Sequence, residues 1–537
     1  MILRVLFFVY LLLFFTSCDN SNDEWVNNTI LSEKNILAAS SVNIKSILDK
    51  SDLDNIENIP YEQQIIFDAF KTSFNSQNLG FDIDSPQKLF IVSQKNKFNA
   101  AAFLVGDVTN ENTFKETIKS YLAADGFVGE NPTICFSEKY NLTIGFNSTH
   151  FLVGFSLDKN FTTDKINSYF QSKPANSKNF LLSKFLNKTD DYSFYISNSN
   201  LLEFINSIKI PFIKSQISNK LNINLLTEDF ILDLNFLNGK IVANTQYSSS
   251  SSDKTRFSSV DKKYKNFLTN NDSLLSFGFA NIPPNNLEKY FNQIIKSTWD
   301  MENKQSRLNL REVIPALDGS MSFSLNKPLN SLISADSSYQ QNYKNIYSIQ
   351  NPKSNVEEVE SEENWDDDDF FQEEEEFSEN SNISIPYNIS MGIKEKQILK
   401  DIFHKNKVEL KQDELLNINN TFLLYKNDVL HCSNDLQLLE SILKEETKPY
   451  SKIKESHFQN PVYMEIDLEA ILLVYFPKSI LDNLDENQNL RQTFSKIILS
   501  SSKDGFHLEF GLKQKDKNAL LQLLEAIMKN KTLENYL

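Results

Sequence analysis

Glycine and arginine are scarce in this sequence, and their scarcity excludes several classes of function. The 537 residues include 12 glycines, and neither a Gly-x-x-x-x-Gly-Lys-Ser/Thr phosphate loop nor a Gly-x-Ser-x-Gly nucleophile turn occurs. Five of the 54 basic residues are arginine, and the net charge is −17. Because nucleic acids are bound through clustered positive charge and their bases are read mainly by arginine, the composition argues against nucleic-acid binding.

Cysteine and histidine are also few. The three cysteines are Cys18, Cys135 and Cys432, and no two of the five histidines lie within four residues of each other. No Cys-x-x-Cys or His-Glu-x-x-His pattern occurs, so we predict no metal centre and no cofactor. His431 and Cys432 are adjacent in a strand-like stretch, where neighbouring side chains point to opposite faces. One disulfide between Cys135 and Cys432 is an alternative, but we expect two separate buried thiols.

The first 18 residues have the layout of a secretion leader. Arg4 is followed by an apolar run from Val5 to Phe15, a small pair at 16–17, and then Cys18. The run has about 11 residues and is too short to cross a bilayer, which takes about 20, but it suits a cleaved signal. The pattern resembles a bacterial lipobox, with Phe15 where leucine is usual. We therefore predict cleavage before Cys18 and lipidation of its thiol.

Negative charge is concentrated in one segment. Residues 357–379 hold 14 acidic residues and no lysine or arginine, which leaves −17 + 14 = −3 for the rest of the chain. Such a density of like charges favours a solvated loop. A plain insertion, docking to a protein partner and weak Ca²⁺ binding all remain open, although the spacing of an EF-hand loop is absent. The candidate partner or cation contacts are Trp365, Asp366, Asp367, Asp368, Asp369, Phe370, Phe371, Glu373 and Glu374.

Strand and helix patterns alternate along the remaining chain. Apolar stretches are followed by an Asx residue and a helical Leu/Ile spacing, with Asn43, Asn200, Asn286 and Asp467 as the expected N-caps. Hairpin patterns precede the other helices, and one hairpin should pair residues 320–325 with 383–389 around the acidic segment. Alternation of this kind predicts an α+β fold in which helices cover antiparallel sheets.

The order of these units occurs twice, which leaves two interpretations open: an internal duplication, or a single irregular α+β fold. We predict a lipoprotein signal peptide over 1–18, a polar tether over 19–35 and a first repeat over 36–257. A second repeat is expected over 273–537, with an acidic disordered insertion at 353–381.

No catalytic residue can be named from the sequence. A glycosidase needs two carboxyl groups about 5–9 Å apart in a cleft, which spacing along the chain cannot establish. Glu465 and Asp467 alternate along one predicted strand and so share a face, but Asp467 is already explained as a helix cap.

The opening of the folded part resembles a known family. Residues 36–53 read ILAASSVNIKSILDKSDL: an apolar strand, an Asn and a Lys/Ser-rich helix start. Together with the lipobox, this segment is similar to the start of a family of Bacteroidota envelope lipoproteins of unknown function. The resemblance implies an outer-membrane lipoprotein on the periplasmic or the surface side, and it carries over no catalytic residue. The acidic insertion departs from the family's pattern.

These observations favour a lipid-anchored protein of the cell envelope with a non-catalytic binding or structural role. Its expected partner is the membrane, through the lipid at Cys18, and a protein partner at the acidic loop is the alternative to a plain insertion there. The alternative is an envelope hydrolase that acts on glycans or peptides through carboxylates that the sequence does not identify.

Overall fold

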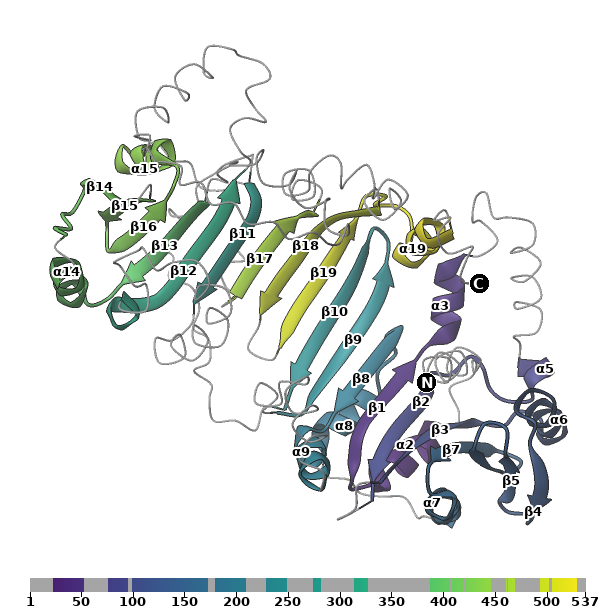
Figure 1. Cartoon of the computed structure of the whole chain (residues 1–537). Helices are drawn as coiled ribbons and strands as arrows, with labels where there is room; N and C mark the ends of the chain where they lie inside the picture. Colours follow the sequence, from purple (N-terminus) through teal and green to yellow (C-terminus); the bar gives the residue numbers. More distant parts are fainter. Residues whose placement is uncertain are drawn as a thin grey trace, which may run out of the picture. The chain divides into compact units, whose positions relative to one another are not determined.

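The structure is a computed structural model that combines helices with antiparallel strands, so the predicted α+β class is confirmed (Figure 1). It describes residues 23–52, 76–94, 99–171, 179–208, 228–248, 274–281, 313–326, 387–405, 408–418, 421–445, 460, 462–468, 493–501 and 505–528. The chain forms two compact units. Unit 1 comprises Met1–Phe257 and Lys478–Leu537, and unit 2 comprises Ser258–Pro477.

Unit 1 is built on one antiparallel sheet. Its strands run in the order β4-β5-β6-β7-β3-β2-β1-β8-β9-β10-β19-β18. The strands are β1 (Ile36–Val42), β2 (Gln87–Ser93), β3 (Ala100–Asp107), β4 (Asp125–Val128), β5 (Thr133–Ser137), β6 (Leu142–Phe146), β7 (His150–Ser156), β8 (Tyr192–Ile196), β9 (Phe230–Leu237), β10 (Lys240–Tyr247), β18 (Phe494–Ser501) and β19 (Phe506–Leu512). The helices are α2 (Asp23–Ser32), α3 (Ile44–Ser51), α5 (Ser76–Leu79), α6 (Glu111–Leu122), α7 (Lys159–Gln171), α8 (Phe180–Leu186), α9 (Asn198–Asn206) and α19 (Ala519–Met528).

The C-terminal hairpin β18–β19 joins the sheet of unit 1. Lys240 of β10 pairs with Gly511 of β19, and Asn244 pairs with His507. The two units thus divide the predicted repeat 273–537: Ser258–Pro477 forms unit 2, and Lys478–Leu537 belongs to unit 1. Strand partners this far apart in sequence cannot be predicted from local patterns. The alternation of side chains in a strand predicts which residues share a face, but it does not predict which strand lies next to it.

Part of the predicted tether is a helix. Within residues 19–35, Asp23–Ser32 forms α2, and its Val26 and Ile30 are 4 % and 0 % exposed. Trp25 stacks on His150 of β7, with 4.2 Å between ring centroids. The tether prediction is wrong over α2. The many polar residues of this segment suggested a solvated linker, whereas two apolar residues four positions apart suffice to dock one helical face.

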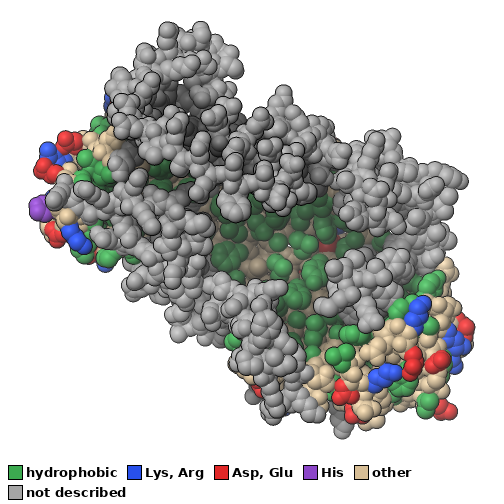
Figure 2. All heavy atoms as spheres, in the orientation of Figure 1, with side chains coloured by type: hydrophobic (Ala, Val, Ile, Leu, Met, Phe, Trp, Pro, Cys, Tyr) green, Lys and Arg blue, Asp and Glu red, His purple; other side chains and the backbone are tan. Residues whose placement is uncertain are grey.

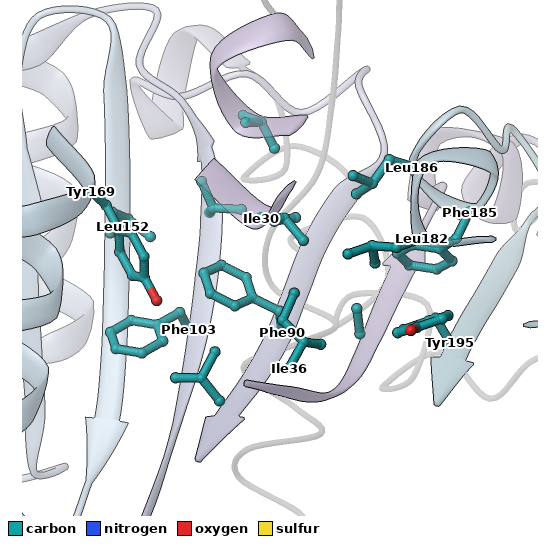
Figure 3. Close-up of a cluster of buried hydrophobic side chains, with 14 of the residues drawn as sticks. Ile30, Ile36, Phe90, Phe103, Leu152, Tyr169, Leu182, Phe185, Leu186 and Tyr195 are labelled. Atoms are coloured by element: carbon teal, nitrogen blue, oxygen red, sulfur yellow. The ribbon is translucent and has the colours of Figure 1, made fainter. Parts of the chain in front are cut away.

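The main core of unit 1 lies between α2, α7 and α8 and one face of the strands β1, β2, β3 and β8 (Figure 3). Phe90 and Phe103 from β2 and β3 are fully buried and stack with 5.4 Å between centroids. Tyr169 of α7 meets both rings edge-on. Aromatic pairs of this geometry add to the area term of burial, so this cluster fixes one face of the sheet firmly.

The cap of α3 follows the sequence prediction, whereas that of α9 does not. Asn43 Oδ1 accepts a hydrogen bond from Ser46 N at 3.0 Å, as expected of an N-cap. Helix α9 begins earlier than predicted, with Ser197 in the N-cap position. The Asn200 side chain instead donates to the Ile36 carbonyl of β1 at 2.8 Å. The polar run 197–200 offers several capping residues, and the tertiary contact decides among them.

Unit 2 contains a second antiparallel sheet, in the order β17-β11-β12-β13-β16-β15-β14. The strands are β11 (Leu274–Asn281), β12 (Leu317–Asn326), β13 (Tyr387–Ile393), β14 (Leu415–Ile418), β15 (Thr421–Lys426), β16 (Val429–Ser433) and β17 (Val462–Asp467). The helices are η4 (Ile314–Ala316), α14 (Lys396–Lys405) and α15 (Leu436–Leu443). Phe323 of β12 pairs with Ile389 of β13, which confirms the predicted pairing of these two strands.

The two sheets connect their strands in the same sequence. In unit 1, β1 pairs with β2 and β8, β2 with β3, β3 with β7, and β7 with β6, which pairs with β5. In unit 2, β11 pairs with β12 and β17, β12 with β13, β13 with β16, and β16 with β15, which pairs with β14. Helices α6 and α14 follow the third strand of each series.

Candidate functional site

The residues that the sequence put forward for lipidation and partner binding lie outside the described residues. They are Cys18, Trp365, Asp366, Asp367, Asp368, Asp369, Phe370, Phe371, Glu373 and Glu374. Lipidation and the role of the acidic segment stay predictions.

The two other cysteines are buried free thiols, as expected. Cys135 lies in the apolar cluster beneath α6, and Cys432 in the apolar cluster beneath α14. Burial raises the pKa of both thiols to about 12. A thiol with so high a pKa is a poor nucleophile near neutral pH.

His431 points to the opposite face of β16 from Cys432. Its Nδ1 lies 2.7 Å from Ser390 Oγ, and His431 and Ser390 are 0 % and 3 % exposed. A Ser–His contact is also the start of a nucleophilic triad. Here burial and the nearby Lys426 lower the pKa of His431 to about 3, and no substrate reaches a pair so deeply enclosed. We interpret it as a buried polar contact between β13 and β16.

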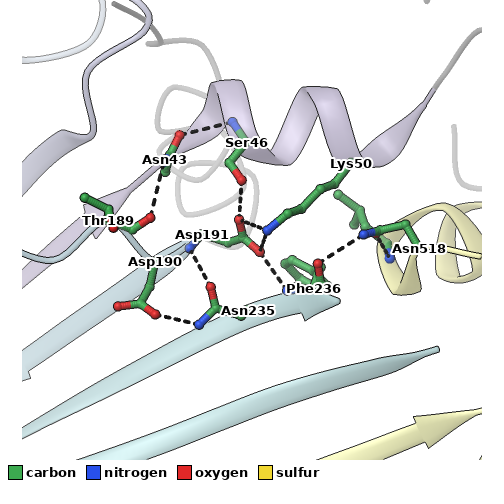
Figure 4. A network of polar contacts seen from close by, with 10 residues as sticks. Asn43, Ser46, Lys50, Thr189, Asp190, Asp191, Asn235, Phe236 and Asn518 are labelled. Atoms are coloured by element: carbon green, nitrogen blue, oxygen red, sulfur yellow. Dashed lines mark hydrogen bonds and ion pairs between the residues drawn. The ribbon is translucent and has the colours of Figure 1, made fainter. Parts of the chain in front are cut away.

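The most connected carboxylate of unit 1 also serves the fold (Figure 4). Asp191, at the start of β8, accepts hydrogen bonds from Lys50 Nζ at 2.6 and 2.8 Å, from Ser46 Oγ at 2.6 Å and from Phe236 N at 2.6 Å. Its side chain is 1 % exposed. The donors on α3 and β9 occupy the oxygens of this carboxylate, which therefore holds α3 and β9 to the start of β8. We interpret it as a structural group and not as a catalytic acid or base.

Glu465 and Asp467, the other carboxylates that the sequence suggested, lie on β17. Glu465 accepts a hydrogen bond from Tyr463 at 2.8 Å, and Asp467 lies exposed at the end of β17. In the described part of the chain, no group of three or more His, Cys, Asp or Glu side chains could hold a metal ion. None of the described helices is long and apolar enough to cross a membrane.

The most distinctive surface of unit 1 is an apolar sheet face. In an antiparallel sheet, directly paired residues share a face. The pairs Phe194–Leu232, Leu234–Ala243 and Ala243–Leu508 therefore carry one face from β8 across β9 and β10 to β19. We call this surface the apolar face; its residues are Leu89, Ile91, Tyr192, Phe194, Ile196, Phe230, Leu232, Leu234, Phe236, Ile241, Ala243, Thr245, Tyr247, Ile497, Leu499, Phe506, Leu508 and Phe510, with Ala38, Ser40 and Val42 of β1.

The two faces of these strands differ in burial. On the core side, Phe90, Tyr195 and Ile231 are 0 %, 1 % and 0 % exposed. On the apolar face, by contrast, the large side chains are only half-buried, and none of them carries a charge. Figure 2, in the orientation of Figure 1, shows hydrophobic side chains gathered over β9, β10 and β19. A wide uncharged surface that remains partly open is a feature of binding sites.

On β10, β18 and β19 the opposite, polar face carries the charged side chains Lys240, Lys496 and Glu509, together with the apolar Val242 and Ile498. Lys240 Nζ lies 2.8 Å from Glu509 Oε2, and His507 Nδ1 lies 2.7 Å from Asn244 Oδ1. The charged side chains of these strands therefore lie on one side, and the other side carries none. At one end of the apolar face the rings of Phe230, Tyr247 and Phe506 pack against one another in sequence.

Sequence reasoning missed this surface, although a signal was present. Residues 506–512 read FHLEFGL and residues 230–237 read FILDLNFL, with alternation typical of strands that have one apolar face. Alternation alone does not tell a covered face from an open one. That distinction needed the strand order, which joins segments more than 250 residues apart, such as β10 and β19.

Comparisons with known proteins add little. No protein-family model matches the chain, and no curated protein matches it. Among solved structures, crystal form IV of TP0453 matches with a TM-score of 0.23 at 13 % identity, over 41 % of this chain and 79 % of that one. Crystal form III of TP0453 matches with a TM-score of 0.24 at 11 % identity, over 44 % and 82 %. At these TM-scores neither match carries an argument.

Proposed function

We propose that the protein is a lipid-anchored, non-catalytic binding protein of the cell envelope, and that the apolar face of unit 1 binds lipid acyl chains. One observation carries the proposal: across seven neighbouring strands, from β2 to β18, one face bears no charged side chain, and its large side chains are half-buried. Aliphatic chains suit such a surface because they bring no polar group that would need a hydrogen-bond partner.

The energies involved are adequate for binding. Each buried methylene group contributes about 0.8 kcal/mol, so about ten methylenes on the apolar face would yield about 8 kcal/mol. That figure corresponds to a dissociation constant near the micromolar range before the cost of ordering the chain is subtracted. Acyl chains of common membrane lipids are long enough to supply these contacts.

The predicted anchor would keep unit 1 beside a source of acyl chains. Helix α2 begins at Asp23, five residues after Cys18, and five extended residues span at most about 17 Å. Two further contacts attach α2 to the rest of unit 1. Lys88 Nζ donates to Asn27 Oδ1 in the middle of the helix at 2.8 Å, and Glu33, which follows the last residue of the helix, forms an ion pair with Lys165. A lipid on Cys18 would therefore place unit 1 within one short linker of the bilayer, and the membrane is its proposed partner.

We also infer that the chain arose by duplication. The support is the common order of strand pairing in the two sheets, including the helix that follows the third strand. On this proposal β18 and β19 correspond to β9 and β10, because each hairpin follows the strand that pairs with the first strand of its series.

The acidic segment remains a proposed docking element for a basic protein partner. Pull-down from solubilised envelope with the full chain and with a variant lacking residues 357–379 tests this role. A partner retained by both chains argues against docking. Calorimetric titration with Ca²⁺ tests the ion alternative, and no heat at about millimolar Ca²⁺ would remove it.

A matched pair of variants tests the acyl-chain proposal. Ile497 and Ile498 are neighbours on β18, both half-buried, but Ile497 pairs with Phe510 on the apolar face and Ile498 pairs with Glu509 on the polar face. Envelope membranes that contain the full chain are treated with a photoactivatable fatty acid, and labelled peptides are identified by mass spectrometry.

We expect adducts on β9, β10 and β19. Ile497→Asn should reduce labelling several-fold, since a buried amide without partners costs about 1–3 kcal/mol, and Ile498→Asn should leave it unchanged. Equal labelling of both variants would contradict acyl binding. If Ile497→Asn instead dissociates a dimer in sedimentation experiments, the face binds a second copy of the chain and the proposal fails.

A further inference from the structure

Unit 2 contains a pocket beside α14 that is independent of the apolar face. Its volume is about 410 Å³, which lies within the range of small-molecule sites. One wall is the helix α14, and the other is the segment 408–412 that follows it. Val408 N donates to the Phe403 carbonyl at 2.9 Å, and Gln412 bridges to Tyr425 of β15, so both ends of the second wall are attached to the fold.

Helix α14 presents a basic stripe to this pocket. Lys396, Lys400 and His404 follow one another at intervals of four residues and therefore lie on the same side of the helix. Leu399 and Phe403 occupy the adjacent stripe and are fully buried in the core of unit 2. Like charges four residues apart repel, so this spacing lowers the stability of an isolated helix.

The unpaired charge of the lining is positive. Lys396 is paired with Asp428, and Lys411 lies 3.8 Å from Glu409 and 3.5 Å from Glu414, so Lys400 supplies the positive charge that has no acidic partner among the described residues. The whole chain carries −17. A local positive site on a negative molecule attracts small anions, whereas the surrounding field repels large polyanions.

Lys400 is the cation most available to a ligand. Lys396 Nζ lies 2.7 Å from Asp428 Oδ1, and Lys411 Nζ lies 3.5 Å from Glu414 Oε2. Among the residues that the structure describes, Lys400 and His404 have no ion-pair partner, and both are exposed.

The remainder of the lining is uncharged. Val408 and Leu410 contribute apolar side chains, and Tyr425 contributes its ring. Burial raises the pKa of the Tyr425 phenol, which therefore stays protonated near neutral pH. Its hydroxyl donates toward Asp428 Oδ1 at 3.4 Å. The pocket thus combines a cationic side with an apolar side.

We propose that this pocket binds a phosphomonoester, with the phosphate beside Lys400 and Lys396 and the organic part against Val408, Leu410 and Tyr425. A phosphate group presents three acceptor oxygens, so it can contact Lys400 and at the same time share Lys396 with Asp428. Lysine ammonium groups bind phosphate as point charges. The same chemistry is found in soluble phosphomonoesters and in the headgroup of lysophosphatidate, and the experiment separates these two sources.

The test uses the full chain, purified in a non-ionic detergent, and isothermal titration calorimetry. One arm adds glycerol 3-phosphate, with glycerol as the uncharged control. The second arm adds lysophosphatidate in mixed micelles, with lysophosphatidylcholine as the control that lacks a phosphomonoester. The variant is Lys400→Gln. Lys444→Gln is its match, because Lys444 caps α15 elsewhere in unit 2, is 59 % exposed and lies 3.9 Å from Glu440.

We expect Lys400→Gln to raise the dissociation constant of the phosphomonoester about tenfold, the effect of one charge-assisted hydrogen bond. Lys444→Gln should change it less than about twofold. The side-chain NMR signals of His404 should shift on binding in the parent chain. Saturable binding of glycerol 3-phosphate assigns a soluble ligand, and binding of lysophosphatidate alone assigns a headgroup.

The proposal is overturned if neither probe binds with a dissociation constant below about 10 mM, which corresponds to about 3 kcal/mol of binding free energy. It is also overturned if both lysine variants weaken binding equally. Photolabelling of the apolar face is an internal control, because Lys400→Gln leaves unit 1 intact. Loss of phosphomonoester binding with unchanged acyl labelling, or the reverse, shows which of the two sites has failed.

Discussion

Asp191 offers the sharpest test of how unit 1 is held together. Replacing it with alanine removes the acceptor of Lys50, Ser46 and the Phe236 N–H at once. Removal of one partner from a buried ion pair costs about 3–5 kcal/mol, because the remaining charge is left without compensation. Lys50 is 28 % exposed and can regain water, so the cost should lie at the lower end, at about 3 kcal/mol.

The measurement is urea unfolding followed by circular dichroism, with Asp49→Ala as the matched control on the same helix. Asp49 and Lys45 are 66 % and 53 % exposed and lie 3.8 Å apart, and such a surface pair contributes less than about 0.5 kcal/mol. Asp191→Ala should lower the transition midpoint of unit 1, whereas Asp49→Ala should not. The double variant Lys50→Met, Asp191→Ala should recover part of the loss, since no orphan charge remains. Equal midpoints for the two aspartate variants would refute the reasoning.

Three further predictions concern buried groups. Because burial lowers the pKa of His431 from 6.5 to about 3, the unfolded chain binds a proton in this pH window that the folded chain does not. Stability should therefore fall as the pH decreases from 6.5 toward 3, by up to about 1.4 kcal/mol per pH unit, and His431→Gln should flatten the acid branch measured by urea unfolding; parallel curves would contradict it. Cys135 and Cys432, whose pKa values are raised to about 12, should resist iodoacetamide at pH 8 until the protein is unfolded, as read by mass spectrometry, and rapid alkylation of the folded chain would show that the thiols are accessible. Ile30→Ala should cost about 2–4 kcal/mol and increase hydrogen exchange in α2, whereas unchanged exchange would mean that the helix does not depend on its buried contact.

The elements that local chemistry specifies were predictable from the sequence. Asn43 caps α3 because its side chain precedes a helical apolar spacing, and the β12–β13 pairing across the acidic segment was predicted from the repeated order of hairpins and helices. The α+β class rests on the same kind of pattern. These features depend on residues within one or two turns or on adjacent strands, where composition and spacing contain the necessary information.

Long-range pairing was not predictable in the same way. The pairing of β19 with β10 brings Phe510 beside Ile241, and the sequence near either residue contains no sign of its partner. The apolar face is formed by such long-range strand pairings, so it could be recognised only from the strand order. Helix α2 was missed for a related reason: Val26 and Ile30 are too few to stand out among polar neighbours, yet the core of unit 1 accepts both.

The basic pocket shows how net charge can mislead. A value of −17 directs attention to the acidic segment and away from any anion site. Lys396, Lys400 and His404 show helical spacing in the sequence, but a charged stripe is usually a solvated face. Lys411, which completes the positive side, comes from a different segment that only folding brings to α14.

The central claim is that the apolar face of unit 1 carries acyl chains, and native mass spectrometry of the full chain from its own envelope tests it most directly. The account predicts noncovalently bound lipid, at about one or more molecules per chain, for the parent and for Ile498→Asn. It predicts loss of this lipid from Ile497→Asn, whose substitution lies on the apolar face. Lipid-free parent chain, or equal lipid on both variants, would contradict the claim.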